Sequence, residues 1–190
     1  SFATSRTALE SLTQLGQAMR KLDETPLDEA GRRKLEAFYR DTFIPGLSKT
    51  GGENAEVPRL LPVEPGAQVA QKLYIADNPH PYEKGNLLDV APDNSEYSTA
   101  HKRFHAIFAQ IANRIGLEDL MLVDSSLRVV YTYQKTTEFA TNLATGPYAN
   151  TNLSQGVRAM LKTGDRSAVH LADFELYRPN LGKPAAFFCA

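Results

Sequence analysis

The spacing of apolar residues changes at Gly116, and this change constrains the fold more than any other feature of the chain. Before Gly116, apolar residues recur three and four positions apart, which is typical of amphipathic helices. After it, they alternate within short runs, which is typical of β-strands. The sequence therefore predicts an α+β fold in one domain over residues 1–190, with a mainly helical part (1–116) and a sheet part (117–190).

The helical part is predicted to contain a long final helix that Gly116 terminates. Pro45 is expected to end an earlier helix, because its ring cannot continue the hydrogen-bond ladder. Residues 45–66 are rich in Pro and Gly and are expected to be loop. The predicted helices cover residues 8–22, 27–44, 67–75 and 95–115.

The sheet part is predicted to be one antiparallel, PAS-like sheet with a helix crossing one face. Val130 and Thr132 point to one side of the second strand, and Tyr131, Tyr133 and Lys135 point to the other. The predicted strands cover residues 119–124, 128–135, 169–177 and 184–189, and the helix covers 152–162.

Charge and motifs exclude several classes of protein. The 21 basic and 22 acidic residues give a net charge of −1, so we expect no nucleic-acid partner. A single cysteine, Cys189, cannot form an internal disulfide. The chain contains no GxSxG, GxGxxG, GK[ST] or HExxH motif, so we expect no enzymatic activity. It also lacks an apolar run long enough to span a membrane.

Two histidines lie four residues apart on the predicted long helix. His101 and His105 therefore share a face and have the spacing of paired metal ligands. Lys102 stands where a metalloprotease helix would carry glutamate, and no third ligand is evident. The alternative is that His101 makes a buried hydrogen bond within the apolar stripe. We expect no metal and no cofactor.

Alternating polar side chains on two strands form a candidate ligand site. Tyr131, Tyr133 and Lys135 share a face of the second strand, and Asp173 and Tyr177 alternate on the third. If these strands are neighbours, the side chains line a concave face able to bind a small polar molecule. The alternative is a solvated sheet face.

The segment that follows the second strand is a second candidate. Asn142 and Tyr148 flank a Gly146–Pro147 pair and are expected to cover a pocket with polar groups. The alternative is ordinary turn chemistry, since Asn, Gly and Pro all favour turns.

Both ends of the sequence indicate a piece of a larger protein. A heptad stripe already runs near Ser1, and the apolar run Lys183–Ala190 stops abruptly. The stripe is predicted either to pair with a second copy or to pack on the chain's own Phe104 and Phe108. Its residues are Ala8, Leu12, Leu15, Met19 and Leu22.

Four stretches together resemble a known family. They are YIADNPHP (74–81), YSTAHKRFHAIF (97–108), DLMLVDSSLRVVYTYQKTTEFATNLATGPYANTNLSQGV (119–157) and LADFELYRPNLGKPAAFF (171–188). In order and spacing they resemble Cache domains, also called PDC or extracellular PAS-like domains. Such domains are the sensors of bacterial chemotaxis receptors, histidine kinases and nucleotide cyclases.

The resemblance implies a non-catalytic sensor on the periplasmic or extracellular side of the inner membrane. It implies a small-molecule ligand, tethering to the membrane by segments outside this chain, and a homodimer in the full receptor. In the family a final strand follows, which this chain lacks. The chain has no Trp, so the amino-acid-binding pattern of some members is incomplete. The competing interpretation is a protein-interaction module without a small-molecule ligand.

Overall fold

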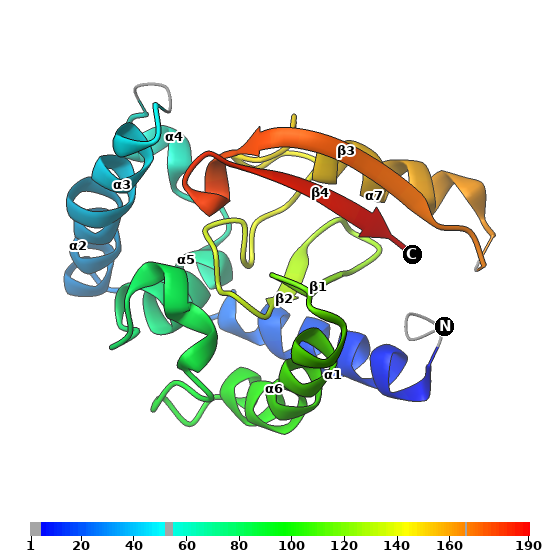
Figure 1. Cartoon of the computed structure of the whole chain (residues 1–190). Coiled ribbons are helices and arrows are strands. Elements are labelled where there is room, and N and C mark those ends of the chain that lie inside the picture. Colours follow the sequence, from blue (N-terminus) through cyan, green and yellow to red (C-terminus); the bar gives the residue numbers. More distant parts are fainter. Residues whose placement is uncertain (1–4, 52–54, 166) are drawn as a thin grey trace.

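The computed structural model describes residues 5–51, 55–165 and 167–190 and has an α+β architecture. Helices dominate the first part of the chain, and two antiparallel hairpins follow (Figure 1). The helices of the first part are α1 (Arg6–Leu22), α2 (Glu29–Phe38), η1 (Tyr39–Phe43), α3 (Ile44–Lys49), α4 (Val57–Leu60), α5 (Pro65–Gln71), η2 (Lys72–Ala76), η3 (Tyr82–Leu87) and α6 (Glu96–Ile115). None of the helices in the described ranges has both the length and the apolar character needed to cross a lipid bilayer.

The long helix α6 has the ends that its sequence predicts. The side chain of Ser95 accepts a hydrogen bond from the Ser98 amide and caps the N-terminus. Gly116 adopts a left-handed conformation with φ 71° at the C-terminus, where a side chain would be strained.

The prediction that Pro45 ends a helix is wrong. A π-helical turn, η1, separates α2 from α3, and Pro45 lies in the first turn of α3. The backbone of Phe43 and Ile44 is helical, so the chain stays helical past the proline, with the π-helical turn directly before it. The expected loop also contains α3 and α4.

The prediction of one continuous sheet is also wrong. Strands β1 (Met121–Val123) and β2 (Val129–Thr132) form one hairpin, and β3 (His170–Tyr177) and β4 (Lys183–Cys189) form another. The free edge of β2 pairs with the chain that follows it: Val129 exchanges hydrogen bonds with Ala140 and Thr141. This local pairing occupies the position beside β2 that β3 would take if the two strands were neighbours.

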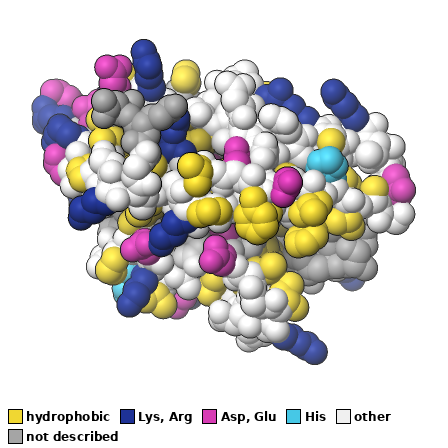
Figure 2. All heavy atoms as spheres, turned by 45° about the horizontal axis from the view of Figure 1, so that its top comes forward, with side chains coloured by type: hydrophobic (Ala, Val, Ile, Leu, Met, Phe, Trp, Pro, Cys, Tyr) yellow, Lys and Arg dark blue, Asp and Glu magenta, His cyan; other side chains and the backbone are white. Residues whose placement is uncertain are grey.

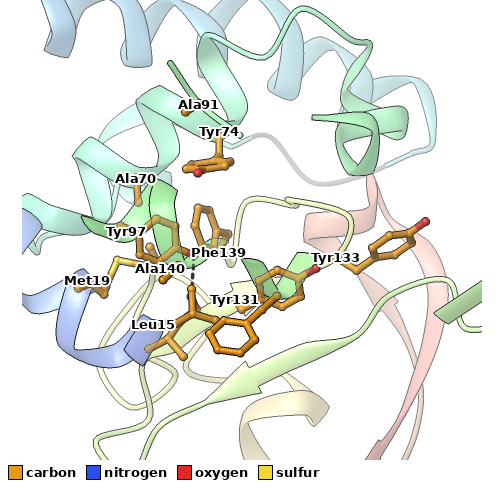
Figure 3. Close-up of a cluster of buried hydrophobic side chains, with 14 of the residues drawn as sticks. Leu15, Met19, Ala70, Tyr74, Ala91, Tyr97, Tyr131, Tyr133, Phe139 and Ala140 are labelled. Atoms are coloured by element: carbon orange, nitrogen blue, oxygen red, sulfur yellow. Dashed lines mark hydrogen bonds between the residues drawn. The ribbon is translucent and has the colours of Figure 1, made fainter. Parts of the chain in front are cut away.

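The main core lies between α1, α5, α6 and β2. Leu15 and Met19 of α1 face Tyr97 of α6 and Phe139 across this core, and Tyr133 lies at its far side (Figure 3). The apolar stripe of α1 is therefore buried against the chain's own helices, including Phe104 and Phe108. Of the two packing modes considered for this stripe, the structure contains the intramolecular one.

Helix α7 (Asn152–Thr163) covers one side of the β3–β4 hairpin. The short helix η4 (Arg178–Asn180) connects its two strands. The opposite side of the hairpin is apolar and exposed, and it forms part of the yellow surface in Figure 2. Its most exposed members are Leu171, Phe174, Leu176 and Phe188.

Candidate functional site

A lysine lies inside the molecule just after β2. Lys135 is only 1% exposed, and its backbone is left-handed with φ 59°. Its Nζ donates one long hydrogen bond of 3.3 Å, to the carbonyl oxygen of Tyr133. Because an ammonium group can donate three hydrogen bonds, this amine has unused donor capacity. Burial lowers the pKa of Lys135 to about 7, and the charges of Asp119 and Asp89 oppose that shift.

Asp119 forms the acidic part of the same cluster. Its Oδ1 accepts hydrogen bonds from the backbone amides of Leu120, Tyr133 and Gln134, at 2.7, 2.8 and 3.0 Å. Its Oδ2 is buried without a hydrogen-bond partner. Burial raises the pKa of Asp119 to about 6, although the three amides and Lys135 favour its ionised form. One oxygen of the carboxylate thus anchors the end of β2, and the other has no hydrogen-bond partner.

The two histidines of α6 lie close enough to Lys135 for its charge to lower their pKa values. Their rings stack with centroids 4.8 Å apart. His105 Nδ1 lies 2.7 Å from the Tyr131 hydroxyl, and His105 Nε2 lies 3.0 Å from the carbonyl oxygen of Asn86. Because a carbonyl only accepts, Nε2 carries the proton and Nδ1 accepts from Tyr131. Burial lowers the pKa of His105 to about 4, which keeps this ring neutral at physiological pH.

His101 makes the buried hydrogen bond that the sequence offered as the alternative to metal binding. Its Nδ1 donates to the carbonyl oxygen of Asp89 at 2.8 Å, and its Nε2 is buried without a partner. Burial, followed by the charge of Lys135, holds the pKa of His101 well below its usual value. Within the described residues, no three His, Cys, Asp or Glu side chains form a group that could hold a metal ion.

Residues 82–89, which include η3, cover this cluster; we call them the cover segment. A side chain at Gly85 would collide with the carbonyl oxygen of Gln134 at 2.4 Å and lie 3.4 Å from Lys135 Cβ. Glycine therefore lets the backbone lie directly on Lys135. Asn86 contributes twice, since its carbonyl accepts from His105 and its Nδ2 donates to the Tyr133 hydroxyl at 2.9 Å.

A second buried polar group adjoins the first. Glu138 lies in the segment after β2, and its Oε1 accepts a hydrogen bond of 2.7 Å from the Thr136 hydroxyl. Its Oε2 and the Tyr177 hydroxyl are both buried without a partner of normal geometry, yet each perturbs the other's pKa. Burial, then the charge of Asp119, raises the pKa of Glu138 to about 8. The charge of Asp119 affects the pKa of both Lys135 and Glu138, so the cluster around Lys135 and the group around Glu138 are electrostatic neighbours.

The structure brings only some of the predicted site residues together. Tyr131, Tyr133 and Lys135 are buried beside α6, where both faces of β2 are covered; neither face is solvated. Tyr177 and Tyr148 belong to the second group, where the Tyr148 hydroxyl donates to Thr137 at 2.6 Å.

Two predicted residues lie apart from both groups. Asp173 is exposed on β3, in the other hairpin. Asn142 serves a turn, because its amide donates to the Ser126 carbonyl and its Oδ1 accepts from Ala144. For Asn142 the turn interpretation describes the contacts that the structure contains.

Sequence reasoning missed three residues of this site: Asp119, Glu138 and Asn86. Each is a common polar residue next to a strand or within a loop, and no periodic pattern distinguishes it. Gly85 gave the one available signal, because an isolated glycine in a polar segment indicates close approach of two backbones.

Two hollows of the described surface lie away from this cluster. A shallow one of about 550 Å³ follows the outer face of α1 at Arg6, Leu9 and Glu10. Another, of about 340 Å³, lies between α1 and the start of α6 and includes Lys21 and Tyr97. Neither is lined by Tyr133, Lys135 or Asp173.

Comparisons with protein-family models, curated proteins and solved structures gave no match to this chain.

Proposed function

We propose that this chain is the ligand-sensing domain of a bacterial transmembrane receptor and binds a small polar molecule at the cluster around Lys135. One observation supports this proposal most strongly. Lys135 is 1% exposed and has a single long hydrogen bond, in the same cluster as the unpartnered Oδ2 of Asp119. Buried polar groups normally have partners, so such a set indicates function more than stability.

The same site has elements suited to reporting that a ligand is bound. The cluster joins α6 through His105 to β2 through Tyr131, and β2 packs against α1. A molecule that contacts Lys135 would act on residues that support both long helices. The resemblance to Cache domains adds the expected setting: a periplasmic or extracellular location, membrane tethering outside this chain, and a homodimer in the full receptor.

A thermal-shift screen with a metabolite library tests the proposal on the purified chain. A ligand present at about 100 times its dissociation constant stabilises a protein by about 2.7 kcal/mol, which such a screen detects. We expect Lys135→Met and Tyr133→Phe each to reduce the shift from the best metabolite. The matched control is Asp173→Ala, which removes an exposed polar residue from the other hairpin and should leave the shift unchanged.

Two outcomes would contradict the proposed site. In the first, the metabolite stabilises Lys135→Met and Tyr133→Phe as much as the unmodified chain. In the second, Asp173→Ala alone abolishes the shift, which would place the ligand at β3.

A protein-interaction module remains the second candidate because of the β3–β4 hairpin. Leu171, Phe174, Leu176 and Phe188 expose apolar side chains on its uncovered side. Monomeric soluble proteins rarely expose extended apolar patches. This candidate predicts that Phe188→Ser abolishes binding of a partner protein, whereas Lys135→Met has no effect on it.

A further inference from the structure

The middle of the cover segment, residues 83–87, is held in place mainly by polar contacts, whereas Tyr82 and Leu88 near its ends pack against the core. Glu83, Lys84 and Leu87 are exposed, and the segment is tied to Lys183 of β4 by an ion pair from Glu83. Asn86 ties it to His105 and Tyr133. Segments with few buried apolar contacts and exposed hydrogen bonds open at lower free energy than the core does.

The two ends of the cover segment are held more firmly than its middle. At one end the ring of Tyr82 packs on Phe38 and Phe43, and its hydroxyl donates to the Pro179 carbonyl at 2.7 Å. Just beyond the other end, Ala91 is buried in the main core. This arrangement allows the middle to move while both ends stay attached.

The middle of the segment lies on the lysine that the proposed function requires. Gly85 contacts the backbone of Gln134 and approaches Lys135 Cβ, so a molecule cannot reach Lys135 from this side while Gly85 is in place. The described hollows do not reach Lys135. A ligand at Lys135 therefore needs part of the structure to move.

We propose that residues 82–89 are a displaceable cover, whose opening exposes the Lys135 amine to small molecules from solvent. This cover rests on the proposed function, because it controls access to the same site. Opening breaks the contacts of Asn86 with His105 and Tyr133, the hydrogen bond from Asn78 Nδ2 to the Gly85 carbonyl, and the ion pair of Glu83 with Lys183. The last contact links the state of the cover to β4 in the other hairpin.

Acylation of lysines with N-hydroxysuccinimide acetate, read by peptide mass spectrometry, tests the cover without any ligand. Lys102 is exposed on α6 and serves as the internal reference. In the unmodified chain we expect Lys135 to react more slowly than Lys102 but faster than the global unfolding rate, measured by amide exchange in β2. Reaction of Lys135 only at the unfolding rate would overturn the proposal.

Two variants change the opening in opposite directions. Asn86→Ala removes the side-chain hydrogen bond to Tyr133, so we expect Lys135 to react about fivefold faster, the equivalent of one bond worth about 1 kcal/mol. In a Cys189→Ser background, cysteines replacing Glu83 and Lys183 can be cross-linked with bismaleimidoethane. Cross-linking should slow the reaction of Lys135 at least about tenfold, with no change at Lys102.

A second cross-link provides the matched control. Lys21 and Glu96 form another exposed ion pair between α1 and α6, which does not include the cover segment. Cross-linking cysteines at these two positions should leave the reaction of Lys135 unchanged. If Lys135 reacts equally fast with and without the Glu83–Lys183 cross-link, the proposal that residues 82–89 are a displaceable cover is wrong.

The acylation experiment and the metabolite screen can fail independently of each other. A cross-link that protects Lys135 when no metabolite stabilises the chain would support the cover and contradict the proposed function. Stabilisation that depends on Lys135 without any effect of the cross-link would do the reverse.

Discussion

The two hairpins of this molecule use their faces in different ways. Every residue of β2 is buried, because α1, α6 and the segment after the strand enclose it. Strand β3 is covered by α7 on one side only, and Leu171, Phe174 and Leu176 remain exposed on the other. The difference is visible in Figures 1 and 2, where the β3–β4 hairpin lies at the surface.

The comparison shows where polar groups are costly. On β3, Asp173 remains in contact with water, so its charge carries little penalty. Beside β2, Lys135 and Glu138 are enclosed. Burial lowers the pKa of Lys135 and raises the pKa of Glu138, which favours the neutral form of each side chain. Burying an ionisable group without full hydrogen bonding is destabilising. The enclosed hairpin therefore carries both the main core and the candidate site.

Removing one aromatic ring from each region should give the largest contrast. Phe108 is 0% exposed and packs on Tyr131 with ring centroids 4.8 Å apart, whereas Phe188 is 76% exposed. We expect Phe108→Ala to lower the free energy of unfolding by about 3–5 kcal/mol. Phe188→Ala should change it by less than about 0.5 kcal/mol. Urea denaturation measures both, and similar losses would mean that the exposed hairpin face is covered in solution.

The ion pair between Arg128 and Asp23 should show the next largest effect. Arg128 lies at the start of β2, almost fully buried, and contacts both carboxylate oxygens of Asp23 at 2.7 and 3.1 Å. Arg128→Met would leave Asp23 without this partner and should cost about 2–4 kcal/mol in urea denaturation. Arg20→Met is the control, because Arg20 is exposed and lies 3.8 Å from Asp124, at the long end of an ion-pair contact. A loss below about 0.5 kcal/mol for Arg128→Met would show that the enclosure of β2 does not depend on this pair.

Glu138 should give a smaller effect whose sign depends on pH. Its folded pKa is raised to about 8 by burial, so the folded state holds a proton that the unfolded state releases above about pH 4.5. The stability contributed by that proton is full below pH 4.5 and is lost as the pH rises towards 8. Glu138→Gln should therefore stabilise the chain by about 1–3 kcal/mol at pH 8 and have little effect at pH 4. Melting temperatures across this range test it; a pH-independent difference would contradict the raised pKa.

The smallest effect concerns the helix that supports the exposed hairpin. The Thr151 hydroxyl oxygen accepts from the Ser154 amide at 3.2 Å and caps α7. Thr151→Ala should cost about 1 kcal/mol and speed amide exchange in β3 and β4 more than in β2. Ser95→Ala, at the matching position of α6, should act on the β2 region instead. Equal changes in both hairpins for either variant would mean that the two regions unfold as one unit.

Much of the helical part followed from local sequence signals. The stripe of α1 and the ends of α6 follow from side-chain periodicity and from Ser95 and Gly116, which act within one or two turns. Strand pairing could not be predicted in this way, because it depends on which of several segments occupies the free edge of β2. Ala140 and Thr141 take that edge, and nothing in their spacing indicates it.

The candidate site divides in the same way. Alternation along one strand predicted a shared face for Tyr131, Tyr133 and Lys135, but β2 ends at Thr132 and Lys135 has a left-handed backbone with φ 59°. All three are nevertheless buried, on a segment that leaves the strand conformation before it reaches Lys135. The prediction that Asp173 lies beside these residues required β2 to pair with β3. It is wrong because β3 pairs with β4 instead. Asn86 and Asp119 enter the site only through the tertiary fold, which periodicity does not encode.

The central claim is that the polar cluster around Lys135 exists for ligand binding and reduces the stability of the free chain. The folded pKa of Lys135 is lowered from its usual value to about 7, so its burial penalty is absent at high pH and complete below pH 7. Urea denaturation at pH 6.5 of the unmodified chain and of Lys135→Met, with and without the best metabolite from the screen, tests this claim most directly. We predict that Lys135→Met is more stable than the unmodified chain without metabolite and gains little from adding it. A Lys135→Met chain that is less stable, or that gains as much from the metabolite as the unmodified chain, would contradict the account.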